Sequence, residues 1–288
     1  MNSKCVTLLC CSYNRRDALQ FTLQNKLQVR GVDELIFVLD GSTDGSYELL
    51  SEAATRDRRV RVIQKRHSGI QDTRNTGFEA AAHPWVLMID DDDMVPADFA
   101  EKLFDSVSGP DVAIVGAPWL NATKSDVELV AAEKATTRSE RLGLRDSQST
   151  FTRGDIEVPF ICSAALVRRD AALHVGFDGS YKGNSWREET DFYLRVVENG
   201  HRVVRTSTTF SWLERRFSGG HPRMRLKYEA WVLVNELRFQ RRHASALRKI
   251  DPRTTTVLLE VWKTVRPRLG DVVRGLQHRL RSRLGGST

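Results

Sequence analysis

Short apolar runs alternate with amphipathic stretches over the first two thirds of the chain. Runs such as Val6–Cys10, Glu34–Leu39 and Trp85–Ile89 contain few polar residues, which is typical of strands buried on both faces of a sheet. The stretches between them space their apolar residues as helices do. This alternation predicts an α/β fold with a mainly parallel, doubly wound sheet. We expect strands over 6–10, 34–39, 59–64, 85–89, 112–116, 161–167 and 201–206, and helices over 17–27, 47–54, 72–82 and 189–198.

Polar residues gather where three of these strands end, at 11–16, 40–46 and 90–93. In a doubly wound sheet, ligands bind just beyond the carboxyl ends of the strands. We therefore expect the three clusters to meet in one crevice.

The last quarter of the chain is helical in pattern and strongly basic. Residues 213–288 carry 18 Lys and Arg against 6 Asp and Glu, whereas residues 1–212 carry 26 against 31. This shift predicts a catalytic domain over 1–212 and a basic helical extension over 213–288, with helices over 225–249 and from Asp251-Pro252 onward.

The basic extension has two interpretations. Its helices pack on the body with their charges in water, or they dock peripherally on the anionic inner face of a membrane. We expect Tyr228, Trp231 and Trp262 to belong to the core rather than to a membrane anchor.

Composition narrows the setting of the protein. The chain has 288 residues and no apolar run near the ~18–20 residues that a membrane span needs. The apolar run at 5–11 is too short for a secretory signal, which predicts a cytoplasmic protein. The four cysteines lack metal-ligand spacing, so we expect reduced and mostly buried thiols.

Four consecutive aspartates, Asp90–Asp93, follow a buried strand. Hard oxygen ligands concentrated on a loop suit Mg²⁺ or Mn²⁺, and such a cation neutralises a departing diphosphate. An acidic surface turn is the alternative.

Other polar groups have both a structural and a functional interpretation. Asp40 and Asp44 frame either an Asx-type turn or a carboxylate that binds a base or ribose. Arg74 either organises a phosphate-binding or metal-binding loop or is an ordinary helix-surface arginine. Carboxylates at 188, 189 and 191 either stabilise a helix start or supply a general base.

Together these segments resemble glycosyltransferase family 2, the inverting GT-A transferases that use nucleotide sugars. The resemblance covers roughly residues 4–212 and rests on the order and spacing of the segments 6–15, 38–45, 68–77, 90–96 and 188–195. It implies a GT-A (Rossmann-like) fold and a metal-dependent transfer from a nucleoside-diphosphate sugar, commonly a UDP-sugar, to an acceptor hydroxyl.

The resemblance also implies roles in nucleotide binding. Asp40 matches the carboxylate that hydrogen-bonds the base, Arg74 matches an arginine near the diphosphate, and Asp90 points toward the ribose. The remaining residues of the nucleotide-sugar pocket would be Cys11, Ser12, Tyr13, Asn14, Arg15 and Asp91.

The metal and base assignments follow from the same resemblance. Asp90 and Asp92 match an Asp-X-Asp motif, with Asp92 as a ligand of Mn²⁺ or Mg²⁺ to which Asp90 also contributes. The run has one residue fewer than usual before Pro96, so Asp91 or Asp93 can exchange roles with Asp92. His221 matches a loop that closes on the diphosphate or metal, a surface histidine being the alternative.

Glu189 matches the family's catalytic base, which is usually an aspartate. Because glutamate is one methylene longer, Glu188 and Asp191 remain alternatives.

Three competing functions have sequence features for or against them. A nucleotidyltransferase would carry a Gly-rich phosphate loop after the first strand, but residues 11–16 contain no glycine. A nucleic-acid-binding protein would fit the basic C-terminus but not the acidic body, so no nucleic acid is expected. An inactive family member acting as a nucleotide-sugar or partner-binding module is disfavoured by the retained acidic groups.

Overall fold

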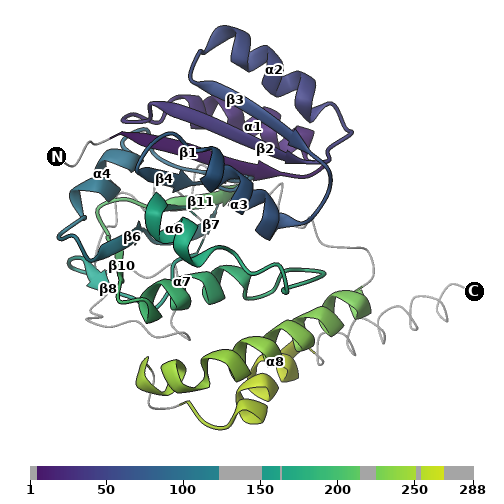
Figure 1. Ribbon diagram of the computed structural model, residues 1–288, viewed down its shortest axis with the longest axis vertical. Coiled ribbons are helices and arrows are strands. Elements are labelled where there is room, and N and C mark those ends of the chain that lie inside the picture. The colour runs from purple at the N-terminus through teal and green to yellow at the C-terminus, as the bar shows by residue number, and fades with distance from the viewer. Residues whose placement is uncertain (1–4, 123–150, 163, 215–224, 251–253, 269–288) are drawn as a thin grey trace, which may run out of the picture. The chain divides into compact units, whose positions relative to one another are not determined.

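The computed structural model describes residues 5–122, 151–162, 164–214, 225–250 and 254–268. The chain divides into two compact units (Figure 1). Unit 1 comprises residues 1–179 and 189–219, and unit 2 comprises 180–188 and 220–288. Unit 2 therefore takes in a nine-residue segment from the middle of the chain. The predicted boundary between 212 and 213 lies inside a strand of unit 1.

An eight-stranded sheet forms the centre of unit 1, in the order β3-β2-β1-β4-β9-β6-β10-β8. Strands β1, β2, β3, β4, β6 and β10 run in one direction, and β8 and β9 run against them. The predicted α/β fold with a mainly parallel sheet is confirmed. The strands are β1 Val6–Ser12, β2 Glu34–Asp40, β3 Val60–Lys65, β4 Trp85–Met88, β6 Val112–Gly116, β8 Ile156–Glu157, β9 Ala165–Arg168 and β10 Arg202–Arg205.

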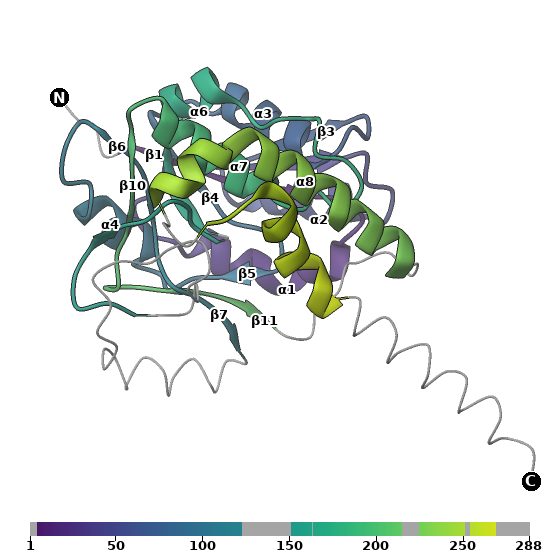
Figure 2. The same ribbon diagram turned by 90° about the horizontal axis from the view of Figure 1, so that it is seen from below.

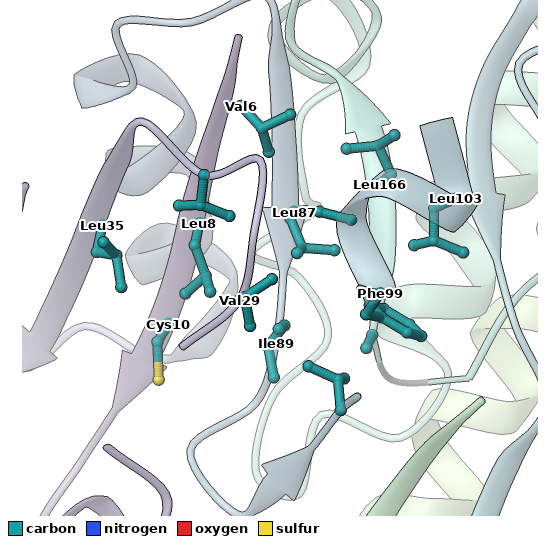
Figure 3. Close-up of a cluster of buried hydrophobic side chains, with 14 of the residues drawn as sticks. Val6, Leu8, Cys10, Val29, Leu35, Leu87, Ile89, Phe99, Leu103 and Leu166 are labelled. Carbon is teal, nitrogen blue, oxygen red and sulfur yellow. The ribbon is translucent and has the colours of Figure 1, made fainter. Parts of the chain in front are cut away.

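Both faces of this sheet are covered. Alternate residues of β1 and β2 belong to two separate apolar clusters, one on each face. Figure 3 shows the first cluster, which extends from Leu35 and Leu8 across Leu87 to Phe99 and Leu103 of α4. Helices α1 Arg16–Leu27, α2 Ser46–Arg56 and α4 Phe99–Asp105 cover this face, and α3 Ile70–Ala80, α6 Arg169–Val175 and α7 Glu188–Glu198 cover the other. Burial on both faces explains why the strands lack an alternating pattern.

A second, three-stranded sheet holds the chain that follows the aspartate run (Figure 2). Strand β11 Ser211–Glu214 pairs antiparallel to β5 Asp93–Met94 and parallel to β7 Trp119–Ala122. Because Asp93 lies opposite Leu213 in this ladder, the end of the aspartate run is fixed by backbone pairing.

Three sequence predictions need correction. Residues 161, 162 and 164 are not in a strand, and β9 begins at Ala165. The helix start predicted at Asp251-Pro252 lies outside the described residues, but residues 254–256 are not helical and the last described helix spans 257–268. Trp262 is 50% exposed and does not belong to the core.

The described part of unit 2 contains α8 Arg225–Ile250, close to its predicted limits, the helix 257–268 and the segment 180–188. Among the residues described, no helix is both long and apolar enough to cross a bilayer. The cysteines are free thiols, and Cys10 and Cys11 are buried, as expected.

Candidate active site

The loops after β1, β2 and β4 meet, as the sequence predicts. Asn14 connects the first two loops, since its backbone N–H donates to Ser42 Oγ (3.0 Å) and its Oδ1 accepts from the Thr43 N–H (2.8 Å). Asn14 has φ = 50°, a left-handed conformation that asparagine tolerates better than most residues. Ser12 connects β1 to the loop after β4, because its Oγ donates to Asp91 Oδ2 (2.6 Å).

Asp40, at the end of β2, is buried beneath the loop that follows β3. Its two carboxylate oxygens accept the backbone N–H groups of Ser68 (2.8 Å) and Gly69 (2.9 Å). Burial alone would raise the pKa of Asp40, but these backbone hydrogen bonds and nearby His67 outweigh it and hold the pKa below its usual value. Asp40 is therefore an ionised acceptor at neutral pH.

An aromatic platform lies beside Asp40. The rings of Tyr13 and His67 stack with centroids 4.3 Å apart, and His67 Nδ1 lies 2.9 Å from Asp40 Oδ2. Both rings are largely exposed, at 46% for Tyr13 and 56% for the His67 side chain. A shallow hollow of about 420 Å³ adjoins them, lined by residues 65–68 and Asp72. Exposed rings next to an acceptor suit a planar, hydrogen-bonding group such as a nucleobase.

The four aspartates point in different directions. Asp91 and Asp93 are 6% and 2% exposed and face inward. Asp91 accepts from Ser12 and lies 3.1 Å from Arg15 Nε, and Asp93 accepts from Trp119 Nε1 (3.1 Å). Burial raises the pKa of Asp91 to about 7 despite Arg15, and it raises the pKa of Asp93 well above its usual value.

Asp90 and Asp92 keep more exposed side chains, at 41% and 18%. Burial and the neighbouring Asp90 charge raise the pKa of Asp92, although Arg15 pairs with Asp92 at 2.5 Å. Within the described residues, no three His, Cys, Asp or Glu side chains gather as a complete metal site. Two mutually repelling oxygen donors nonetheless fit a divalent ion that takes its other ligands from water and a diphosphate.

Arg74 joins the end of β4 to the start of α7. Its Nη2 atom lies 3.1 Å from Asp90 Oδ1 and 2.5 Å from Glu189 Oε1, and its guanidinium stacks 5.2 Å from the centre of the Phe177 ring. The Arg74 side chain is only 6% exposed. It is therefore a buried bridge between two acids, and not a helix-surface arginine.

Glu189 is set apart from the other two candidate bases by its surroundings. Burial raises the pKa of Glu189, the positive charge of Arg74 lowers it, and the negative charge of Asp90 raises it. The net shift of the pKa is upward. Asp191 is fully buried and pairs with Arg195 Nε (2.8 Å), and Arg195 Nη1 donates to the carbonyl of Val175 (2.6 Å). Glu188 is 6% exposed and belongs to unit 2.

Two of the remaining predicted residues, Cys11 and Asp44, have structural roles. Cys11 packs in the apolar cluster under α3. Asp44 is a turn residue, because it accepts from Ser46 N–H (3.1 Å) and Arg16 N–H (2.8 Å). His221 lies outside the described residues.

The sequence analysis missed two kinds of residue at this site. Lys65 ends β3 and His67 follows it, so the same rule about strand ends would have found them. Phe177, beneath Arg74, and Lys26, which donates to the Asp93 carbonyl (3.0 Å), carry no sequence signal because their roles arise from long-range packing.

Comparison with known proteins finds glycosyltransferases among the relatives of this chain. The putative glycosyltransferase EpsH of Bacillus subtilis is 34% identical over 204 residues, covering 70% of this chain and 51% of EpsH. The chain thus spans about half the length of that relative. The amylovoran biosynthesis glycosyltransferase AmsE of Erwinia amylovora is 27% identical over 183 residues, covering 62% of each chain.

Solved structures share the fold. The mannosyltransferase PcManGT from Pyrobaculum calidifontis, in complex with GDP-Man and Mn²⁺, has a TM-score of 0.58 at 17% identity and covers 90% of this chain and 67% of its own. S. aureus TarS 1–349 in complex with UDP has a TM-score of 0.54 at 13% identity, covering 82% of this chain and 65% of its own. The expected GT-A fold is confirmed.

The family model described as glycosyl transferase family 2 matches residues 7–176, which include the loops after β1, β2, β3 and β4. More than half of the chain is matched, and the match contains Asp40, Arg74 and the aspartate run. The chain belongs to glycosyl transferase family 2.

Proposed function

We propose that this chain transfers a sugar from a nucleoside-diphosphate sugar to an acceptor hydroxyl, with UDP as the favoured nucleotide, in a single displacement that inverts the anomeric carbon. The observation that carries the proposal is the Arg74 bridge, which brings a donor-side acid, Asp90, and a candidate base, Glu189, to one guanidinium. The relatives and the solved structures with GDP-Man or UDP support a nucleotide-sugar donor.

The nucleoside would lie on the platform of Tyr13 and His67. An ionised Asp40 accepts an N–H of the base, as an imide N–H of uracil offers. Mn²⁺ or Mg²⁺ would be held by Asp90 and Asp92 and, when bound, would neutralise charge on the leaving diphosphate.

Glu189 takes the proton of the acceptor hydroxyl. The acceptor oxygen forms a bond to the anomeric carbon while the bond to the diphosphate oxygen breaks, and the electron pair leaves with the nucleoside diphosphate. A raised pKa makes Glu189 a stronger base than an ordinary carboxylate. Asp191, committed to Arg195, orients α7 instead of taking the proton.

Arg74 can couple donor binding to the strength of the base. Its attraction lowers the pKa of Glu189 against the effect of burial. A diphosphate that draws the guanidinium away would weaken this attraction, so Glu189 would become more basic when the donor is present.

The test measures thermal stabilisation by UDP, GDP, CDP and dTDP with and without Mn²⁺ or Mg²⁺. We expect metal-dependent stabilisation by one diphosphate, UDP first, and its loss in Asp92→Asn. The matched control is Asp111→Asn, which also removes one carboxylate but lies before β6, away from the carboxyl ends of the strands. Metal-independent stabilisation that survives Asp92→Asn would reject the metal site, and no stabilisation by any diphosphate would reject the donor class.

The cytoplasmic location expected from the sequence stays a prediction. The membrane contact of the C-terminal helices is likewise a proposal, and unit 2 offers a defined surface for it.

A further inference from the structure

Helix α8 buries the apolar Val232, Phe239 and Leu247 together with several polar side chains, and it leaves large apolar side chains exposed. Its buried side chains include four polar ones, none more than 7% exposed: Asn235, Glu236, Gln240 and His243. Its outward side chains include Leu226 at 66% exposure, Leu233 at 43% and Val234 at 45%. A surface helix facing only water normally shows charged and polar residues, not leucines, on its exposed side. The outward leucines indicate that this side meets a second apolar environment.

The outward residues of α8 form one stripe. Leu226, Ala230 and Leu233 are spaced three or four positions apart, and the same spacing continues through Leu237 to Arg241. Arg248 lies on the same line, so the stripe is apolar in its first half and basic in its second.

The helix 257–268 repeats this combination. Leu258 is 74% exposed, Leu259 43% and Trp262 50%. Leu258, Trp262 and Arg266 are one turn apart, so the apolar and basic groups share a face. Half-exposed tryptophan and long basic side chains are suited to the boundary between lipid headgroups and acyl chains.

The acids of these two described helices are turned away from the surface. Glu236 is fully buried against Arg187 (2.8 Å), Glu260 is 7% exposed and pairs with Lys263 (2.8 Å), and Glu229 lies 3.4 Å from Arg268. Over the described part of both helices, every exposed charged residue is therefore basic: Lys227, Arg241, Arg242, Arg248, Lys249, Lys263 and Arg266.

This chemistry selects one partner. Two copies of the chain meeting through this face would oppose like charges, and a nucleic acid would leave the leucines and Trp262 without an apolar partner. An anionic bilayer satisfies both components, since its headgroups attract the cations and its interface accepts the apolar side chains.

We propose that the outward faces of α8 and the helix 257–268 dock this protein on an anionic membrane surface. Leu226, Leu258 and Trp262 enter the interface between headgroups and acyl chains, and the arginines and lysines contact the headgroups. The inference goes beyond the proposed transfer and does not depend on it, because Asp40, Arg74 and Glu189 all belong to unit 1.

The experiment is co-sedimentation of the full chain with vesicles of phosphatidylcholine alone or with about 30% phosphatidylglycerol. We expect binding only to the anionic vesicles, and a steep loss as NaCl rises from about 0.05 M to about 0.5 M. Leu259→Glu should weaken binding about tenfold, because it removes apolar area and adds a repelled charge. Leu173→Glu in α6 is the matched control, since Leu173 has the same 43% exposure and should leave binding unchanged.

The basic half is tested separately. The double variant Arg241→Glu, Arg248→Glu should weaken binding at least about 25-fold, at roughly fivefold for each cation removed. Arg56→Glu with Arg58→Glu, two exposed arginines of unit 1, is the control with the same change in net charge.

Several outcomes would overturn the proposal. They are equal binding to neutral vesicles and an equal loss of vesicle binding in the control variants. The absence of binding to anionic vesicles would also overturn it, including the case in which sedimentation equilibrium shows a dimer that the same variants dissociate. If Leu259→Glu does not fold, tryptophan fluorescence takes the place of that variant. The emission of Trp262 is obtained as the difference between the fluorescence spectra of wild type and Trp262→Phe. A blue shift of Trp262 on anionic vesicles supports docking, and an unchanged spectrum rejects it. Nucleotide-dependent thermal stabilisation is measured in parallel on the same proteins. It tests the proposed transferase site separately from membrane binding.

Discussion

At the scale of single residues, Glu189 and Asp191 look interchangeable in sequence but have different partners. Glu189 shares Arg74 with Asp90, whereas Asp191 is closed in by Arg195. Glu189→Gln keeps the shape and should lower kcat about 10²–10⁴-fold while donor binding persists. The measurement is product formation alongside nucleotide affinity. Undiminished turnover would transfer the role of base to another group.

Asp191→Ala is the contrasting change. It leaves Arg195 buried without its carboxylate partner, so we expect the free energy of unfolding to fall by about 3 kcal/mol. Chemical denaturation of both variants separates the two residues. A stable but inactive Asp191→Ala protein would contradict the assignment.

Arg74 predicts a pH effect of definite sign. Because the pKa of Glu189 is raised and Arg74 pulls it down, Arg74→Met should raise it further. A base must be deprotonated, so activity falls as pH drops through that pKa. The acid limb of kcat/KM should therefore move to higher pH in the variant. A limb that stays in place, or moves to lower pH, would show that Arg74 does not act on the base.

At the scale of elements, α3 packs unusually close to β1 at a glycine. A Cβ on Gly77 would lie 2.3 Å from Leu9 Cδ1, inside the core. Gly77→Ala should cost about 1–3 kcal/mol through overpacking, although alanine favours a helix. Gly179→Ala is the control, since nothing lies within 4 Å of its Cβ position. Equal stability of the two variants in urea unfolding would mean that α3 moves away without cost.

Helices and strands that are defined by a local pattern of apolar residues could be predicted from the sequence. Strands that form only by pairing with distant parts of the chain could not. Strands β1, β2 and β4 and helix α7 could be predicted because each buries a continuous or periodic apolar set. Strands β5, β7 and β11 have only two to four residues, and β11 pairs with chain about 90 to 120 positions earlier, so no window of sequence contains their cause.

The site follows the same division. Strand ends predicted the meeting of Ser12, Asn14 and Asp91, because parallel strands share one carboxyl edge. Asp40 and Asp44 look alike in the sequence, yet Asp40 accepts from the loop after β3, whereas Asp44 accepts from its own turn and from the start of α1. The inward direction of Asp91 and Asp93 depends on partners from other elements, such as Trp119, and could not be foreseen.

At the scale of the whole molecule, the unexpected member of unit 2 is the segment 180–188. Trp186 Nε1 and Arg187 Nε both donate to Glu236 of α8, at 2.7 and 2.8 Å. Arg187 has φ = 71°, an uncommon conformation for a side chain of its size, which these contacts help to maintain. The composition of the chain predicts the basic C-terminal helices. It does not predict that the segment 180–188 contacts them through the buried carboxylate of Glu236.

Glu236 therefore predicts how the molecule unfolds. Glu236→Ala removes the only acid that the structure pairs with the Arg187 guanidinium among the described residues, and should destabilise unit 2 by about 3–5 kcal/mol. Glu229→Ala, also in α8, breaks a weaker 3.4 Å contact with Arg268 and should cost below about 1 kcal/mol. Scanning calorimetry should show a lower first transition in Glu236→Ala, while UDP with Mn²⁺ still raises the transition of unit 1.

The pH dependence of that transition provides a check with a fixed sign. Burial alone would raise the pKa of Glu236, but Arg187, Gln240 and Trp186 outweigh it and lower the pKa. The ionised form thus stabilises the folded state at neutral pH, and this contribution is lost as pH falls below the unfolded value of about 4.3. The difference in the temperature of the first unfolding transition between wild type and Glu236→Ala should therefore become smaller at acid pH. A difference in transition temperature that stays constant from neutral to acid pH would mean that the Glu236 side chain acts through packing alone. The charge of Glu236 would then not stabilise the contact between the segment 180–188 and α8.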